Sequence, residues 1–163
     1  FIHLRKIFFN FSQYNICSLY QSSINFEYSF NTDIAYVKKC FVDKYKPILI
    51  KHKVDSSLIS NAENFFITSF SLNSFDEGYL KPDSLIKFCK HISINQNLFY
   101  DNYYKFVFSS YDKAILNWRN LNNLSQKQAA KLLQVSPVSI CSWERQLSYP
   151  TRIQFASIAN FIL

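Results

Sequence analysis

The 163-residue sequence contains no methionine, a single glycine (Gly78) and only four prolines. Because it begins at Phe1 without a methionine, we expect the chain to be a fragment or a processed product. With so few glycines and prolines to mark the ends of elements, boundaries have to be predicted from hydrophobic periodicity and small polar clusters.

Residues that would bind a metal or a cofactor are also scarce. The four cysteines (Cys17, Cys40, Cys89 and Cys141) form no CxxC pair, and the three histidines complete no metal-ligand spacing. We therefore expect reduced, partly buried thiols in a cytoplasmic protein, with neither a metal nor a cofactor. No apolar run approaches the roughly 20 residues of a membrane span, so we expect no membrane partner.

Catalytic motifs are absent as well. The sequence has no glycine-rich nucleotide loop and no HExxH or GxSxG pattern, so an enzyme is the less favoured class. Asp76 and Glu77 next to Gly78 could form a metal-binding acid pair, but a solvated turn is the favoured interpretation. His52, between two lysines, is interpreted as a solvated or half-buried sheet residue and not as a catalytic base.

Apolar residues make up 48% of the sequence and aromatic residues 18%, enough to bury a core and to exclude wholesale disorder. The formal net charge is +7 and the pI is about 9.2, a balance that favours polyanionic partners. Residues 112–163 contain six basic residues against two acids. This carboxy-terminal third is therefore the stronger candidate for binding a polyanion.

Residues 1–110 are predicted to form an α+β domain with a mostly antiparallel sheet. Alternating apolar and polar residues predict strands, and apolar residues at helical spacing predict helices. The predicted order is strand 24–30, helix 33–45, strand 48–54, strand 65–72, helix 82–91 and strand 103–109. Pro47 is expected to end the first helix, and Leu85, Ile86 and Cys89 are expected to face inward from the second.

Residues 111–163 are predicted to form an all-α domain of four short helices. Ser125 is expected to cap the second helix, and Ser136, followed by Pro137, the third. Periodicity directs these side chains toward the core: Ala114, Ile115, Trp118, Ala129, Ala130, Leu133, Ile140, Trp143, Ile153, Ala156, Ala159 and Phe161. Glu144 is expected to form a structural ion pair within the domain.

The stretch from Leu124 to Arg145 resembles the Cro/XRE helix-turn-helix family of phage repressors, whose pattern is close to LSQxxxAxxLxVSxxxIxxWERGxxxP. The matching residues are Leu124, Ser125, Gln126, Ala130, Leu133, Val135, Ser136, Ile140, Trp143, Glu144, Arg145 and Pro150. Arg119 also matches the family's first-helix arginine. Gln146 departs from the pattern, because it stands where the family usually has glycine and would need a positive φ. The resemblance implies a helix-turn-helix bundle whose helix at about 137–145 enters the major groove of duplex DNA.

The resemblance divides the expected DNA-contacting residues into two groups. The phosphate-contacting positions are Gln126, Lys127, Ser139 and Arg145. The base-reading positions are Pro137, Val138, Cys141 and Ser142, and Ser136, which caps their helix, completes the set. Because the base-reading side chains are short and include no bidentate Arg, Asn or Gln pairing, we expect modest or shape-dependent sequence specificity.

Several functions stay open on the sequence alone. The favoured one is a sequence-specific DNA-binding protein, a transcriptional regulator, with a homodimer as the assembly common in the family. The order of elements in residues 1–110 resembles, in order only, a LAGLIDADG homing-endonuclease subunit, which would make the chain a remnant of such an enzyme. An antitoxin with a carboxy-terminal operator-binding domain is a further alternative, as is a packing unit without DNA affinity. The role of residues 1–110 is unassigned.

Overall fold

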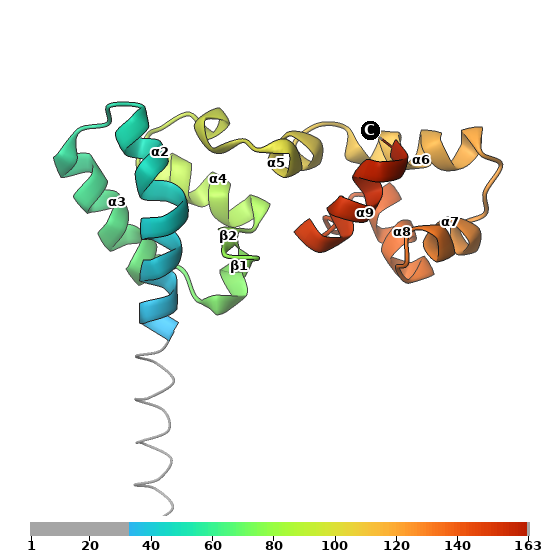
Figure 1. Cartoon of the computed structure of the whole chain (residues 1–163), viewed down its shortest axis with the longest axis horizontal. Coiled ribbons are helices and arrows are strands. Elements are labelled where there is room, and N and C mark those ends of the chain that lie inside the picture. Colours follow the sequence, from blue (N-terminus) through green and yellow to red (C-terminus); the bar gives the residue numbers. More distant parts are fainter. Residues whose placement is uncertain (1–32, 163) are drawn as a thin grey trace, which may run out of the picture.

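The computed structural model describes residues 33–162, which are mostly helical with a small two-stranded antiparallel sheet (Figure 1). Broadly, the chain belongs to the α+β class. After the helical residues 33–40, the elements are the π-helical turn η1 (Phe41–Tyr45), α2 (Lys46–Lys51), α3 (Ser56–Ser69), the 3₁₀ turn η2 (Leu72–Ser74), β1 (Phe75–Asp76), β2 (Tyr79–Leu80), α4 (Pro82–His91), the 3₁₀ turn η3 (Gln96–Phe99), α5 (Asn102–Val107), α6 (Tyr111–Leu121), α7 (Gln126–Leu132), α8 (Pro137–Glu144) and α9 (Arg152–Ile162).

The first described helix runs through η1 into α2, so the prediction that Pro47 ends it is wrong. It buries a residue at every fourth position: Val37, Phe41, Tyr45 and Leu49. On a regular α-helix that spacing drifts by about 40° at each step. In η1 the N–H of Lys46 donates to the carbonyl of Phe41, five residues earlier, and the wider turn counteracts the drift. Pro47 then lies at the start of α2, directly after the π-helical turn, where the regular i→i−4 hydrogen-bond pattern is already interrupted.

Two predicted strands are helices in the structure. Residues 48–54 fall mostly in α2, and residues 65–72 fall mostly in α3. In α3 the cap is Asp55, whose carboxylate accepts from the N–H of Ser57. Its buried residues Ile59, Ala62 and Phe66 follow at intervals of three and four, which is a helical period. The alternation of apolar and polar residues that predicts a strand at 65–72 covers fewer residues than the helical period of residues 56–69. The packing of the whole helix therefore overrides the shorter pattern.

The predicted strand at residues 103–109 is also a helix, α5. Asp101 caps it by accepting from the N–H of Tyr104, and four of its six residues are buried. The sheet is antiparallel, as expected, but its strands β1 and β2 have only two residues each. Glu77 (φ 52°) and Gly78 (φ 76°) form the turn between them, which confirms a turn at this place. The predicted strand 24–30 lies outside the described residues.

The core of residues 33–110, the amino-terminal unit, is built from aromatic rings. Phe66 lies at its centre, with ring centroids 5.2 Å from Phe41, 5.0 Å from Tyr45 and 5.2 Å from Phe88. Helix α4 matches its predicted bounds and buries Leu85 and Cys89 as expected. Ile86, which was expected to face inward, is 41% exposed, because it follows Leu85 directly and points off the buried stripe.

Residues 111–162, the carboxy-terminal unit, form four helices whose caps match the sequence. Ser125 and Ser136 cap α7 and α8, and Pro137 is the first residue of α8. The buried residues shared with the prediction are Ile115, Ala129, Ala130, Leu133, Ile140 and Trp143. In α9, however, Ile153 is 67% and Phe161 49% exposed, and the buried residue is Ile158. The predicted inward face of α9 is therefore wrong.

Helices α6, α7 and α8 are each followed by a residue in the left-handed region. These residues are Asn123 (φ 52°), Gln134 (φ 55°) and Gln146 (φ 56°). After α7, the N–H of Val135 donates to the carbonyl of Ala130 at 2.9 Å, the longer hydrogen bond of a Schellman motif. The positive φ expected at Gln146 is confirmed, and Gln146 adopts there the conformation that favours glycine.

Figure 1 shows the two units side by side, with α5 leading into α6 along one edge of the molecule. Helix α9 crosses the carboxy-terminal unit and points its first turn toward the hairpin of β1 and β2. The N–H of Arg152, the first residue of α9, donates to the Asp76 carboxylate in that hairpin at 2.7 Å. The units are therefore joined both through the chain and through α9.

Candidate functional site

The candidate site is formed by α7, α8 and the turn between them, and local capping defines the start of each helix. At α7, Ser125 and Gln128 form a capping box in which each side chain accepts from the other's backbone N–H, at 3.3 and 2.8 Å. At α8, the Ser136 hydroxyl accepts from the N–H of Ser139 at 3.0 Å. A serine side chain thus satisfies one of the otherwise unpaired N–H groups in the first turn of each helix.

One face of α8 is buried and the other is open. Ile140 is fully buried and Trp143 is 2% exposed, and α8 packs against both α6 and α7. Val138, on the first turn of α8, is 73% exposed. Because a solvent-exposed apolar side chain gains no packing energy, Val138 contributes little to the fold. The first turn of α8 is therefore available for contact with a partner.

The structure places all nine predicted DNA-contacting residues on α7, α8 or their flanking caps, and none of them is buried. The exposed members are Lys127, Ser136, Pro137, Val138 and Arg145. The half-buried members are Gln126, Ser139, Cys141 and Ser142. Of the two groups of residues, the base-reading positions lie together on α8, while the phosphate-contacting positions are spread over both helices.

The end of α8 is tied to α6 and α7 by a charged network. Glu144 accepts from Arg119 Nε at 2.6 Å and Nη2 at 3.2 Å, which confirms the structural ion pair expected of Glu144. Arg119 Nη1 donates to the carbonyl of Leu124 at 3.0 Å. Burial alone would raise the pKa of Glu144, but hydrogen bonds from Arg119 and Gln126 outweigh it and lower the pKa. The hydrogen bonds to Glu144 likewise raise the pKa of Arg119.

The Gln126 side chain bonds Glu144 in the structure, whereas the resemblance implies a DNA phosphate as its partner. Its Nε2 donates to Glu144 Oε2 at 2.8 Å, so one of its two amide hydrogens is engaged within the protein. The second hydrogen is still available to an acceptor such as a phosphate oxygen. The bond to Glu144 fixes the side chain at the start of α7, next to the end of α8. A contact from Gln126 to DNA would therefore come from an amide that is already oriented.

The exposed charge of the carboxy-terminal unit is positive. Its exposed cationic residues are Lys113, Lys127, Lys131 and Arg145. Its two acids are half-buried, and one of them, Glu144, is neutralised by Arg119. The surface that solvent meets therefore has an excess of positive charge that the internal ion pair does not cancel.

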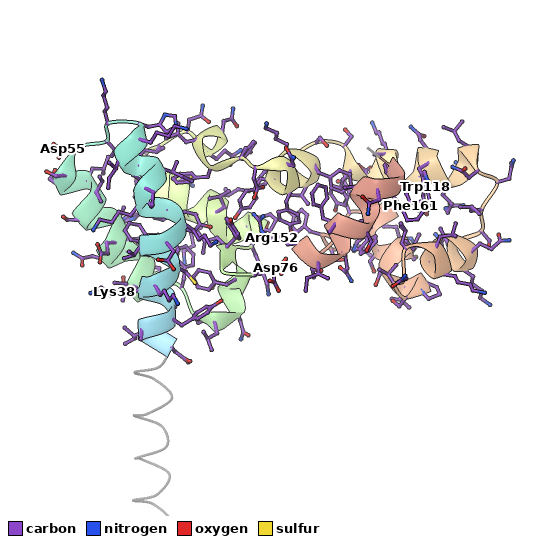
Figure 2. The ribbon with its side chains drawn as sticks, in the orientation of Figure 1. Lys38, Asp55, Asp76, Trp118, Arg152 and Phe161 are labelled. Carbon is purple, nitrogen blue, oxygen red and sulfur yellow. The ribbon has the colours of Figure 1, made fainter. Side chains whose placement is uncertain are left out.

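The sequence does not single out Arg152, which the structure places at the junction of the two units (Figure 2). Its side chain is 12% exposed and pairs with Asp101 at 2.6 Å. A helix cap at Asp101 was detectable in the sequence as an acid before the run Asn102 to Val107, but the partner 51 residues later was not. Asp76 likewise belongs to more than a solvated turn, because it accepts from the first N–H of α9.

Residues 33–162 contain no group of three or more metal-ligating side chains and no helix long and apolar enough to cross a membrane. Cys40, Cys89 and Cys141 are free thiols, as expected, and Cys17 lies outside the described range. Comparison with models of known families, with curated proteins and with solved structures gives no significant match.

Proposed function

We propose that the chain is a sequence-specific DNA-binding protein, a transcriptional regulator whose α7 and α8 act as a helix-turn-helix. The observation that carries the proposal is the two-sided character of α8. Ile140 and Trp143 fix one face of the helix in the core, while Val138, on its first turn, is 73% exposed. A helix with an anchored inner face and a free amino-terminal end can enter the major groove, which is about 12 Å wide.

The polar groups around α8 support the same assignment. Ser136 and Ser139 present hydroxyls at its start, and Lys127 and Arg145 present exposed positive charges on either side of the turn. Hydroxyls, lysines and arginines are the groups that most often contact phosphate and sugar. The base-reading residues would then be Pro137, Val138, Cys141 and Ser142, with thymine methyl groups and single hydrogen bonds as their partners.

The resemblance of residues 1–110 to a homing-endonuclease subunit loses its basis in the structure. That resemblance depended on an order of strands that residues 33–110 do not have, since three of the predicted strands are helical. A sheet that saddles DNA requires long strands, and β1 and β2 have two residues each. We therefore base the proposal on the carboxy-terminal unit alone.

The test is binding of the full chain to duplex DNA, first to a random pool for selection of a site and then to the selected and random duplexes. Lys127→Gln should weaken binding to both duplexes alike and reduce the slope of log K against log salt by about 0.9. Lys90→Gln, which removes the same charge from the exposed face of α4, is the matched control and should change neither value.

Base reading is tested with Val138→Ala and Ser142→Ala in the same assay. Each should reduce the preference for the selected duplex by about 1 kcal/mol, roughly fivefold, and leave binding to random duplex nearly unchanged. Absence of any binding at low salt would contradict the proposal as a whole. Normal binding with unchanged preference in both variants would show that a surface other than α8 reads the DNA.

A further inference from the structure

The first turn of α9 is held against the amino-terminal unit through Arg152. The Arg152 backbone N–H donates to Asp76 Oδ2 at 2.7 Å, and its Nη1 donates to Asp101 Oδ2 at 2.6 Å. Asp101 is used twice, because its other oxygen accepts from the N–H of Tyr104 and caps α5 at 2.9 Å. One carboxylate thus connects the start of α5 directly to the start of α9.

The guanidinium of Arg152 is enclosed by three tyrosine rings. Its central carbon lies 3.9 Å from the ring centroid of Tyr79, 4.4 Å from Tyr103 and 4.6 Å from Tyr104. Its Nε and Nη2 are buried without a hydrogen-bond acceptor among the described residues. The π faces of the rings compensate the charge there, and such desolvated contacts are the strong form of the cation–π interaction. A guanidinium is more weakly hydrated than an ammonium, so arginine suits this enclosed position better than lysine would.

Neighbouring contacts support this arrangement on both sides of Arg152. The Tyr149 hydroxyl donates to Asp83 Oδ1 at 3.1 Å, and the Tyr103 hydroxyl donates to the carbonyl of Pro150 at 3.0 Å. Phe155, one turn further along α9, packs its ring 5.7 Å from Tyr103 and 5.2 Å from that of Phe106. Apolar, polar and ionic contacts between the two units are therefore concentrated around the first turn of α9.

We propose that Arg152, together with Asp76, Asp101 and the three tyrosines, is a strut that fixes the carboxy-terminal unit in one orientation on the amino-terminal unit. The chain between the units is short, since only residues 108–110 separate α5 from α6. A short link alone still permits rotation about its backbone dihedrals, and the strut opposes that rotation from the far side, through α9. The two units consequently tumble and unfold as one body.

The strut goes beyond the proposed function and stands whether or not the chain binds DNA. Where α8 does bind DNA, the strut carries the amino-terminal unit at a fixed angle to the duplex. A partner bound to that unit would then be held in a defined position along the DNA. This gives residues 33–110 a mechanical role that their sequence does not indicate.

The experiment is ¹⁵N relaxation of the full chain, with calorimetry on the same samples. The unmodified chain should show one rotational correlation time for both units and one unfolding transition. Arg152→Gln should give different correlation times for the two units and lower the melting temperature of the carboxy-terminal unit by about 5–10 °C. Lys105→Gln removes one charge from an exposed side chain of α5 and is the control, with no change expected.

Asp101→Asn is the milder variant, because asparagine still caps α5 while the ion pair with Arg152 is lost. Asp101→Asn should also give different correlation times for the two units and a lower melting temperature, both by a smaller amount than Arg152→Gln. If Arg152→Gln fails to fold, Asp101→Asn is the variant that tests the proposal. The proposal would be overturned if Asp101→Asn behaved like Lys105→Gln, with equal correlation times for both units and an unchanged single unfolding transition. Different correlation times in the unmodified chain would overturn it as well.

Discussion

Replacing Glu144 by alanine is the sharpest test of how the carboxy-terminal unit is held together. The Glu144 side chain is 8% exposed and accepts three hydrogen bonds, two from Arg119 and one from Gln126. The Arg119 side chain is 17% exposed. Glu144→Ala therefore removes an anion from between three helices and leaves a largely buried guanidinium with only the carbonyl of Leu124 as its partner.

The expected cost follows from that geometry. Removing one partner of a buried pair typically costs about 3–5 kcal/mol, because the remaining charge stays desolvated. Arg119 retains some exposure and one carbonyl, so we expect a loss at the lower end, about 3 kcal/mol in the free energy of unfolding. For a chain of this size that corresponds to a fall of about 6–12 °C in melting temperature.

The assay is urea denaturation at neutral pH, with Glu63→Ala as the matched control. Glu63 forms a looser pair with Lys46 at 3.7 Å, and the two side chains are 23% and 39% exposed. A surface pair of this kind contributes about 0–1 kcal/mol, so the control should change stability little. Equal losses for Glu144→Ala and Glu63→Ala would refute the reasoning, because they would show that burial of the Glu144 network adds nothing.

The same network makes a prediction for pH. Because the folded state lowers the pKa of Glu144 below its unfolded value of 4.5, the carboxylate contributes stability that is fully present above that value. The contribution is lost as the pH falls through the lower, folded-state pKa. The stability difference between the unmodified chain and Glu144→Ala should therefore shrink in acid. A difference that stays constant down to pH 2 would contradict this assignment of the pKa shift.

Two further predictions use other features of the structure. Gln146→Gly should stabilise the chain by about 1 kcal/mol, because Gln146 has φ 56°, a conformation that does not strain glycine. Asn117→Gly, on the exposed face of α6, should instead destabilise the chain by roughly 0.3 kcal/mol, the difference in helix propensity between the two residues; thermal unfolding measures both. Burial raises the pKa of Cys89 to about 12, so at pH 8 Cys89 should be alkylated far more slowly than the half-buried Cys141. Peptide mass mapping measures both rates, and equal rates would contradict this prediction.

The ends of the carboxy-terminal helices could be predicted because each depends on local chemistry. Ser125 and Ser136 cap their helices through bonds that span three residues, and Pro137 suits the first turn by its own geometry. The ion pair of Glu144 could also be expected, since its position in the pattern implied a structural partner. The capping signals lie within a few residues of the feature they specify, so one sequence suffices to detect them, whereas Arg119, the partner of Glu144, lies 25 residues away and is not specified by a local signal.

The strands of the amino-terminal unit were mispredicted because short alternating runs satisfy two periods. Leu49 is the last member of a series with Val37, Phe41 and Tyr45, at intervals of four residues, and only this longer series identifies the helix. The signal was present in α3, where Asp55 is followed by Ile59, Ala62 and Phe66. Longer windows would have recovered α3, but not the π-helical turn that lets the first helix continue past Pro47.

The inward face of α9 shows why tertiary contacts lie beyond such reasoning. Ile153 and Ile158 are equally apolar, and the sequence alone cannot choose which of them is buried. In the structure the Arg152 guanidinium lies among Tyr79, Tyr103 and Tyr104, and these long-range contacts accompany one particular rotation of α9 about its axis. With that rotation, Phe155 and Ile158 face the protein and Ile153 faces solvent. The buried face of α9 therefore goes together with contacts to residues far away in the sequence, such as Asp76 and Asp101, which the periodicity of α9 itself does not specify.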